Sequence, residues 1–452
     1  MTSAEASCTG HPPDIVGVLS VDAKAMADCA DQGEEILSRL PPRPGRSAEQ
    51  QATADAVHRS SRWLRHRFMD AHAGTVYDTL TEGLSRPLRL AELASAAAEE
   101  FRGLVPGREL MAAESARLQA DKEGWEVDQA VFFQGVLRQA TAGLHLMRSM
   151  LRPTPRALEL LPEFQQTGRL DLGAVRVVRD GPAARLTIHN EHCLNAEDNR
   201  LTADLETAVD LALLDDQVHV GVLRGSVMTH PRYTGRRVFS AGINLKHLHE
   251  GRISFIDFLL GRELGFIHKL VRGLSMDDTP LTWPRRTVEK PWLAGVDTFA
   301  IGGGMQLLFT VDKVVAGADA FFSLPAAQEG IVPGVGNLRL GRLAGGRLAR
   351  RVILGGRRIW ASEPVAELIC DEVTEPDQVG AALDRGITQL DNAAVVANRK
   401  MINVAEEPID ALRAYLAEFS LTQGLRLYSQ DVITKVGRFS AATSGVPAKG
   451  DP

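Results

Sequence analysis

The chain has 452 residues, of which 44% are hydrophobic and 24% are charged, an ordinary globular composition with room for two or three domains. Its 51 Lys and Arg residues against 57 Asp and Glu residues leave a net charge of −6, which argues against a nucleic acid partner because phosphate backbones are bound by clustered positive charge. The four cysteines lack CxxC spacing, which excludes a disulfide framework and an obvious structural zinc site; they are Cys8, Cys29, Cys193 and Cys370.

The first 21 residues carry acidic residues and a His-Pro-Pro sequence but no long apolar core, so no secretory signal is expected. No apolar run elsewhere approaches the roughly 18 residues that a membrane-spanning helix requires. We therefore expect a cytoplasmic protein without a membrane partner. The start of the chain (residues 1 to about 13) and a tail over residues 441–452 are expected to be flexible.

Residues 47–168 have a helical pattern. Ser47 and Gln50 have capping-box spacing, and Val57, Leu64 and Phe68 recur on one face. Further helices are predicted over 88–104, 108–122 and 127–151, after a proline-rich linker at 41–45 and before a stop at the Pro153 and Pro155 region. These elements predict an all-helical N-terminal domain over residues 1–170.

After residue 170, strands alternate with helices. A hairpin is predicted around Asp180-Gly181-Pro182. The nearly unbroken apolar run at 218–223 is typical of a strand in a sheet that is covered on both faces. Further elements are a helix over 205–214, strands at 293–296, 311–316 and 320–324, and a helical end over 393–436. The fold class predicted for residues 171–440 is therefore α/β.

The most informative sequence is Phe299-Ala300-Ile301-Gly302-Gly303-Gly304-Met305-Gln306-Leu307. Glycines between an apolar strand and an apolar helix allow close backbone approach and leave N–H groups free at the helix N-terminus. Such a turn can bind a phosphate or a developing oxyanion, although glycines also form plain turns. It lacks the lysine of a P-loop and the dinucleotide-binding pattern.

Three more segments carry information: Leu194-Asn195-Ala196-Glu197, Phe239 to Lys246, and Leu324 to Gly334. Together with the glycine-rich segment, their order and approximate spacing resemble the motifs of the crotonase (enoyl-CoA hydratase) superfamily. The resemblance covers about residues 172–440 and implies a crotonase-like ββα spiral core. It also implies that the backbone amides of Ile243 and Gly303 form an oxyanion hole for an acyl-CoA thioester. Two such donors stabilise the charge on a thioester enolate.

Hydratases of this superfamily use two glutamates, and the matching positions here are Gln306 and Ala326. Neither side chain acts as a general acid or base near neutral pH. The resemblance therefore implies an oxyanion hole without the machinery for adding water to an enoyl-CoA.

Over nearly the whole chain, the closer resemblance is to the cofactor-independent dioxygenases of this superfamily that oxidise arylacetyl-CoA thioesters. It rests on the helical extension and on five sequences: Asp121 to Glu126, Leu144 to Leu146, His230 to Tyr233, Arg262 to Gly265 and Glu289 to Trp292. It implies conversion of 3,5-dihydroxyphenylacetyl-CoA and O2 into 3,5-dihydroxyphenylglyoxylate and CoA, without metal or organic cofactor, on a route to the dihydroxyphenylglycine of glycopeptide antibiotics.

The same resemblance places Glu197, Arg262 and Gln306 at the substrate site. Arg262 would hydrogen-bond the substrate and offset its charge, and Glu197 is the candidate base. Residues expected to bind the substrate or its CoA part are Asn244, Leu245, Lys246, Gly304 and Arg237. Residues expected to line an apolar pocket for O2 are Leu245, Trp292 and Ile331.

Each assignment has a plainer alternative. Glu197 and Arg262 can form a structural ion pair, Lys246 and the Arg236-Arg237 pair can be solvated, and Trp292 and Ile331 can be core residues. His189-Asn190-Glu191 has the HxE pattern of half an iron site. His247 and His249 have a comparable spacing, but residues two apart on a helix point away from each other.

Three functions remain open from the sequence. The leading one is the cofactor-independent dioxygenase, and the alternatives are an acyl-CoA hydrolase or isomerase with the same fold, and a catalytically silent subunit that binds CoA esters. An intact Gly302-Gly303-Gly304 turn counts against the silent subunit. The resemblance also implies a homo-oligomer, a trimer or a hexamer.

Overall fold

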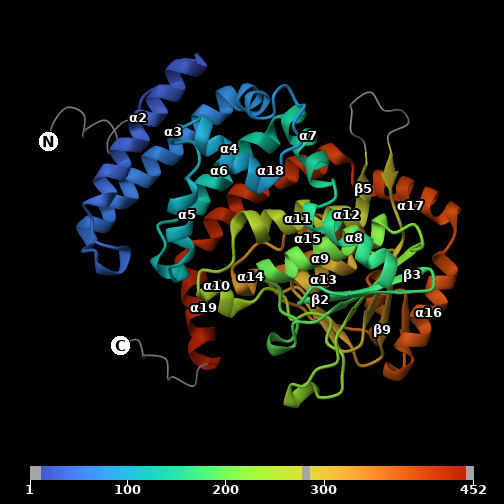
Figure 1. Ribbon diagram of the computed structural model, residues 1–452. Helices are drawn as coiled ribbons and strands as arrows, with labels where there is room; N and C mark the ends of the chain where they lie inside the picture. Colours follow the sequence, from blue (N-terminus) through green and yellow to red (C-terminus); the bar gives the residue numbers. More distant parts are fainter. Residues whose placement is uncertain (1–11, 277–285, 444–452) are drawn as a thin grey trace. The chain divides into compact units, whose positions relative to one another are not determined.

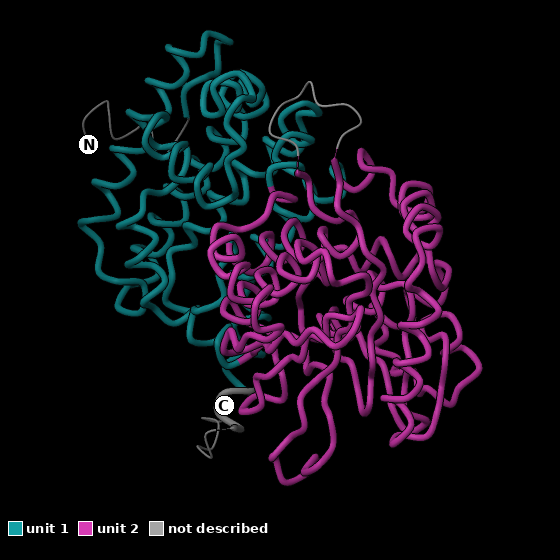
Figure 2. Tube along the Cα trace, turned by 45° about the vertical axis from the view of Figure 1, so that its right-hand side comes forward, with its two compact units in different colours: residues 1–149, 246–256, 413–452 teal, residues 150–245, 257–412 magenta. Residues whose placement is uncertain are grey.

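The computed structural model describes residues 12–276 and 286–443, which form two compact units (Figure 2). Within these residues, unit 1 contains 12–149, 246–256 and 413–443, and unit 2 contains 150–245, 257–276 and 286–412. The flexible start predicted for residues 1–13 lies almost entirely outside the described residues, as does most of the tail predicted from 441, and Cys8 lies outside them too.

Unit 1 is helical. The capping box predicted at Ser47 is present: its side chain accepts from the Gln50 amide, and the Gln50 side chain accepts from the Ser47 amide. The helices are α2 (Leu19–Ser38), α3 (Ala48–Leu80), α4 (Leu90–Glu100), α5 (Arg108–Ser115), α6 (Trp125–Arg138), α7 (Ala140–Met150), α10 (Leu245–His249), α18 (Ile409–Leu427) and α19 (Gln430–Thr443), with 3-10 turns at Arg43–Gly45 and Gln119–Asp121.

Unit 2 is built on a seven-stranded sheet with the order β1-β2-β3-β4-β7-β9-β12. Strands β2, β3 and β9 of this sheet are labelled in Figure 1. The β1-β2-β3 part is antiparallel and the remaining pairs are parallel. The strands are β1 (Arg169–Asp171), β2 (Val175–Asp180), β3 (Ala183–Ile188), β4 (Val220–Gly225), β7 (Trp292–Val296), β9 (Lys313–Gly317) and β12 (Glu372–Thr374). The hairpin predicted around Gly181 is confirmed by the β2-β3 pairing.

Two smaller sheets complete the strands of unit 2. One has the order β11-β10-β8, from Ile359–Trp360, Phe321–Ser323 and Phe299–Ile301, and the other pairs β5 (Leu274–Ser275) with β6 (Thr287–Val288). The helices are α8 (Pro155–Thr167), α9 (Asn199–Leu214), α11 (Gly261–Leu264), α12 (Phe266–Arg272), α13 (Gly303–Leu308), α14 (Ala326–Glu329), α15 (Gly336–Ile353), α16 (Val379–Leu390) and α17 (Ala393–Glu406), with a π-helical turn at Phe255–Leu260 and 3-10 turns at Glu191–Cys193, Pro231–Tyr233, Pro364–Leu368 and Pro376–Gln378.

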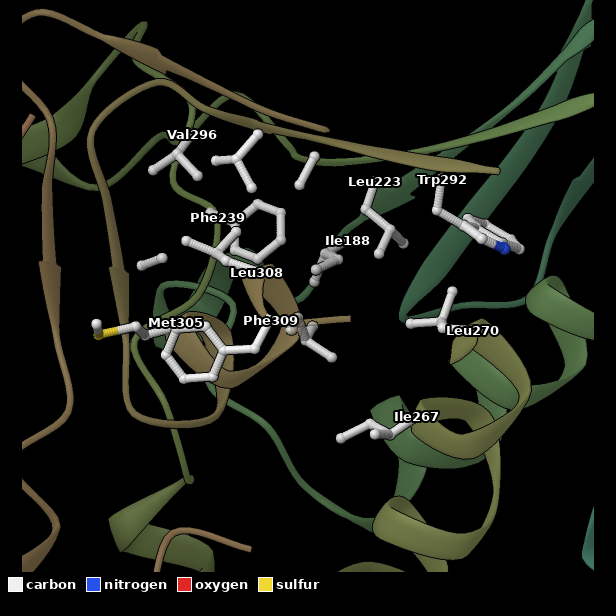
Figure 3. Packing of buried hydrophobic residues seen from close by; sticks show 14 of the residues in the cluster. Ile188, Leu223, Phe239, Ile267, Leu270, Trp292, Val296, Met305, Leu308 and Phe309 are labelled. Atoms are coloured by element: carbon white, nitrogen blue, oxygen red, sulfur yellow. The ribbon is translucent and has the colours of Figure 1, made fainter. Parts of the chain in front are cut away.

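Helices cover both faces of the large sheet, as the apolar run of β4 predicts. On one face, Leu383 and Ile387 of α16 pack on Val220 and Leu293. On the other face lies the main core, to which β3, β4 and β7 contribute together with α9, α12 and α13. Figure 3 shows part of this core. Among the described residues, no helix is long and apolar enough to cross a membrane.

The division into units differs from the predicted boundary at residue 170. Thr154 and Pro155 do not simply end a helix, because Thr154 is the N-cap of α8 and its side chain accepts from the Ala157 amide at 3.2 Å. Proline fits at the first helical position because no N–H is needed there. Helix α8 then packs on α9, which places it in unit 2.

Candidate active site

Three chain segments of unit 2 meet near the glycine-rich turn. Glu197 and Ile243 form a parallel bridge, in which the Glu197 amide donates to the Gly242 carbonyl at 2.7 Å and the Asn244 amide donates to the Glu197 carbonyl at 2.8 Å. Ser240 forms a second bridge with Ala300, in the strand that leads into Gly302. The turn is therefore placed directly beside the segment that carries Ile243.

The geometry leaves two backbone amides available. The bridge to Glu197 uses the Gly242 carbonyl and the Asn244 amide, so the N–H of Ile243 faces away from Glu197. Among the described residues, this N–H makes no backbone hydrogen bond. Gly303 is the first residue of α13, where amides have no partner within the helix. A Cβ atom on Gly302 would lie 4.0 Å from the Ile243 nitrogen, so the two segments are in contact.

Gly302 determines the shape of this turn. Its φ of 55° and ψ of −119° lie in a region that residues with a Cβ atom avoid. Glycine is therefore required at this position for its backbone conformation, which lets the chain turn from β8 directly into α13.

Arg262 lies at the centre of a buried hydrogen-bond network and is 3% exposed. Its Nε donates to Oε2 of Glu197 at 2.6 Å, and one Nη2 hydrogen goes to the Gly303 carbonyl at 2.8 Å. Nη1 donates to Glu263 at 2.9 Å and to Oε1 of Gln306 at 3.1 Å. The three residues predicted at the substrate site, Glu197, Arg262 and Gln306, are therefore in one cluster.

These contacts define what Arg262 does within the protein. A guanidinium has five N–H donors, and four of them are directed to Glu197, Glu263, Gln306 and Gly303. Among the described residues, the fifth donor makes no such contact. Arg262 holds the Gly303 carbonyl and the Glu197 carboxylate in place, and its contact with the substrate stays a prediction.

The surrounding charges keep Arg262 protonated. Burial opposes its charge, but the carboxylates of Glu197 and Glu263 outweigh burial and raise the pKa of Arg262 above its usual value. Because arginine only donates hydrogen bonds, its contact also orients Gln306, whose Oε1 faces Arg262. The Nε2 group of Gln306 is then left to donate elsewhere.

Glu197 is held on two sides. The Ser240 hydroxyl donates to its Oε1 at 3.2 Å, opposite the contact with Arg262, and the side chain is 2% exposed. Ser240 also accepts from the Gly242 amide at 3.1 Å, which fixes the turn that precedes Ile243. Glu197 is thus an ion-paired carboxylate at the site, so the structural ion pair considered from the sequence exists and lies next to Gly303.

Irregular helix geometry brings Arg262 and Glu263 to the same cluster. Neighbouring side chains on a regular helix point in different directions. Here α11 is only four residues long, follows the π-helical turn, and ends at Gly265, whose ψ of −115° breaks the helix. Turns of π-helix are frequent at functional sites.

The other residues expected to bind substrate are more scattered. Asn244 and Gly304 are buried beside the Ile243 and Gly303 amides, and Leu245 is half-buried. Lys246 belongs to unit 1, where its 67% exposed side chain lies 3.9 Å from Glu250. Arg237 donates to the Gly225 carbonyl at 3.0 Å, and burial together with Arg224 lowers the pKa of Arg237. Their CoA contacts stay predictions.

The residues expected to line an oxygen pocket also differ in their surroundings. Trp292 is 1% exposed and belongs to the main core, where Gly221 leaves room for its ring: a Cβ atom there would lie 2.1 Å from it. Figure 3 shows Trp292 near Leu270. These contacts agree with the alternative that Trp292 is a core residue. Ile331 is half-buried and follows α14. The oxygen pocket stays a prediction.

The HxE pattern at His189 has competing contacts. Nδ1 of His189 lies 3.0 Å from Glu191, but its Nε2 lies 2.7 Å from the Arg176 guanidinium. A fixed positive charge at that distance disfavours a metal cation on the same nitrogen. Within residues 12–276 and 286–443, no group of three or more His, Cys, Asp or Glu side chains is placed to hold a metal ion.

Two residues of the cluster were not singled out from the sequence, Ser240 and Glu263. Both lie inside sequences that carry the resemblance. Ser240 begins the Ser-Ala-Gly turn, where short polar side chains often hydrogen-bond the local backbone. Glu263 gives no such signal, because its contacts depend on the irregular helix.

Comparisons with known proteins identify the family. A model of the enoyl-CoA hydratase/isomerase family matches residues 274–418. A (3,5-dihydroxyphenyl)acetyl-CoA 1,2-dioxygenase from Amycolatopsis orientalis is 54% identical over 423 residues, which cover 94% of this chain and 97% of that protein. The chain belongs to the crotonase superfamily, in the family of this relative. The crotonase-like fold predicted from the sequence is therefore confirmed.

Other members of the crotonase superfamily match a smaller part of the chain. A short-chain-enoyl-CoA hydratase from Clostridium acetobutylicum is 27% identical over 212 residues, 46% of this chain and 72% of that protein. The solved structure of an enoyl-CoA hydratase/isomerase from Mycobacterium paratuberculosis is 22% identical and covers 59% of this chain and 98% of that one, with a TM-score of 0.47.

Proposed function

We propose that this protein is a dioxygenase that converts 3,5-dihydroxyphenylacetyl-CoA and O2 into 3,5-dihydroxyphenylglyoxylate and CoA, without metal or organic cofactor. The observation that carries the proposal is the 54% identity to the Amycolatopsis orientalis dioxygenase over 94% of this chain. A match of that extent includes most of the helical unit 1. Apart from residues 413–418, unit 1 lies outside the hydratase/isomerase match at 274–418.

The arrangement of the site supports formation of an enolate. Loss of the α-proton from an arylacetyl thioester places negative charge on the carbonyl oxygen. The amides of Ile243 and Gly303, which have no recorded acceptor among the described residues, are available to donate to that oxygen. Each such donor is worth about 10²–10³ in rate when it is preorganised.

The oxygen chemistry then needs no further redox partner. The enolate gives one electron to O2, and recombination of the two radicals forms a peroxide at the α-carbon. The peroxide oxygen attacks the thioester carbonyl and expels CoA thiolate. Cleavage of the O–O bond, with loss of the remaining α-hydrogen, leaves the α-keto acid. Both oxygen atoms of O2 are then in the product, as the overall stoichiometry requires.

The side chains of the site suit this reaction better than hydration. Gln306 and Ala326 occupy the positions of the two hydratase glutamates, and Gln306 presents an N–H donor rather than a base. Glu197 is the carboxylate closest to the turn: Oε1 would lie 2.5 Å from a Cβ atom on Gly303. We propose that Glu197 accepts or relays the α-proton and that Gln306 orients the thioester or a ring hydroxyl.

An oxygen-electrode assay with metal-stripped protein and synthetic 3,5-dihydroxyphenylacetyl-CoA tests the function. The expected result is consumption of one O2 for each CoA released, with no CoA release under nitrogen. Equal CoA release with and without O2 would instead identify a thioester hydrolase, and binding without turnover would identify a silent subunit. Activity that is lost on chelation and restored by Fe(II) would contradict cofactor independence.

We further propose that the protein works in the cytoplasm as a homo-oligomer, a trimer or a hexamer, with the arylacetyl-CoA and O2 as its small-molecule partners. The family resemblance supports the oligomer, and sedimentation velocity tests it. A monomer at assay concentration would contradict that part of the proposal.

A further inference from the structure

Glu263 connects Arg262 to a loop that is distant in the sequence. Its Oε1 accepts from Nη1 of Arg262 at 2.9 Å, and its Oε2 accepts from the Val335 amide at 3.1 Å. The side chain is 4% exposed. One carboxylate therefore ties the central arginine of the site to residues 330–336, which contain Ile331.

The loop is shaped to receive this carboxylate. Gly334 has a φ of 41°, and a Cβ atom there would lie 2.0 Å from Oε1 of Glu263. Gly336 is similarly close to the site, because a Cβ atom on it would lie 3.1 Å from Cγ of Gln306. These glycines let the backbone approach Glu263 and Gln306 directly.

We propose that Glu263 is a positioning residue for the proposed dioxygenase reaction, on which this inference rests. It orients the Arg262 guanidinium so that Nε reaches Glu197 and Nη2 reaches the Gly303 carbonyl, and it holds residues 330–336 against the same cluster. Glu263 acts through Arg262 and the loop and does not itself contact the substrate.

The physical consequence concerns turnover more than binding. With glutamine in place of Glu263, one acceptor oxygen and the negative charge are lost, so the side chain can no longer accept from both Nη1 of Arg262 and the Val335 amide, and Arg262 is held less firmly. The Gly303 carbonyl and Glu197 then lose part of their support, and the amide donors are less well aligned. Errors of about 1 Å in such alignment can cost about 10²-fold in rate, whereas contacts to the rest of a large CoA ester are unaffected.

Glu263→Gln is the variant that tests this role, and Glu407→Gln is its matched control. Glu407 is also a buried glutamate of unit 2 and pairs with Arg339 at 2.8 and 3.0 Å, but it has no recorded contact with Arg262, Glu197 or Gln306. Four quantities are measured for each: kcat and KM from O2 uptake, the rate of exchange of the substrate α-protons for deuterium under nitrogen, and Tm.

The expected result is a loss of about tenfold or more in kcat and in α-proton exchange for Glu263→Gln, with KM within about threefold of the unmodified protein. Glu407→Gln should lower Tm but keep kcat. If both variants lose activity only in proportion to their loss of folded protein, or if Glu263→Gln keeps kcat and exchange, the positioning role is wrong.

The unmodified protein separates this inference from the proposed function. If it takes up no O2 with the substrate, the dioxygenase proposal itself fails. If it is active while Glu263→Gln is unaffected, only the role of Glu263 fails. Should Glu263→Gln not fold, Gly334→Ala disturbs the same contact from the loop. It is expected to lower kcat in the same way, and a normal kcat there would overturn the inference.

Discussion

Substitution of Gly303 by alanine tests the amide pair most directly. A Cβ atom on Gly303 would lie 2.5 and 2.6 Å from the two carboxylate oxygens of Glu197 and 2.7 Å from its Cδ. Glu197 cannot simply move away, because Arg262 holds Oε2 at 2.6 Å and Ser240 holds Oε1 at 3.2 Å. The added methyl group must therefore displace the carboxylate, the peptide at Gly303, or both.

The size of the effect follows from these distances. Ordinary non-bonded contacts begin near about 3.5 Å, so the two groups must separate by about 1 Å. Misplacing one oxyanion donor by that amount should cost about 10²–10³ in kcat. Overpacking of a buried site also costs about 1–3 kcal/mol of stability, equivalent to a fall in Tm of about 2–10 °C.

The assay compares O2 uptake and anaerobic α-proton exchange with those of Gly341→Ala. Gly341 lies in α15, and a Cβ atom on it has no neighbour within 4 Å, so this control adds the same methyl group without a clash. Gly303→Ala should lose both activities while its circular dichroism spectrum stays native. A folded Gly303→Ala protein with kcat within about threefold of the control would refute the assignment of the oxyanion hole.

Three further substitutions have defined outcomes. Arg262→Lys should lower kcat by about 10²-fold, because one ammonium group cannot replace the planar fork of donors; O2 uptake near the normal rate would contradict this. His268 is buried, which lowers its pKa to about 3 from 6.5, so the unfolded chain takes up a proton below pH 6.5 that the folded protein excludes. The His268 imidazole should therefore lower the free energy of unfolding by about 2 kcal/mol from pH 7 to pH 5. Urea titrations at the two pH values should show that this contribution is absent in His268→Leu, and the same pH dependence in both proteins would contradict the prediction. In unit 1, the Tyr428 hydroxyl donates to Glu126, so Tyr428→Phe should cost about 1–3 kcal/mol, measured as a lower Tm, and an unchanged Tm would show that this contact contributes nothing.

Not all elements could be found from local sequence signals. Helix α2 (Leu19–Ser38) was missed because its N-cap is Val18, which makes no side-chain cap. The carboxylate of Asp22, in the first turn, instead accepts from the Val16 and Gly17 amides at 2.9 Å each and so fixes the segment that leads into the helix. The sequence places a helix stop at Pro153 and Pro155, and α7 does end at Met150. The new helix that begins at Pro155 was not predicted, since proline is compatible with either end of a helix and the packing of α8 on α9 is not visible in the sequence.

The sequence by itself determined the parts of this protein that depend on local chemistry. The glycine turn at 302–304, the apolar strands of a covered sheet, the capping box at Ser47 and the replacement of two hydratase glutamates by Gln306 and Ala326 are all properties of short segments. The resemblance of four short segments, 194–197, 239–246, 299–307 and 324–334, implied the superfamily and the pair of candidate amides.

Only the tertiary structure decided how the site is held together. Arg262 meets Glu197 and Gln306 across 65 and 44 positions of the chain, and Glu263 meets Val335 across 72. No local pattern specifies which of the five donors of an arginine goes to which acceptor. That depends on an irregular helix, on glycines that let distant backbone approach, and on burial, which requires each charged group to find a partner.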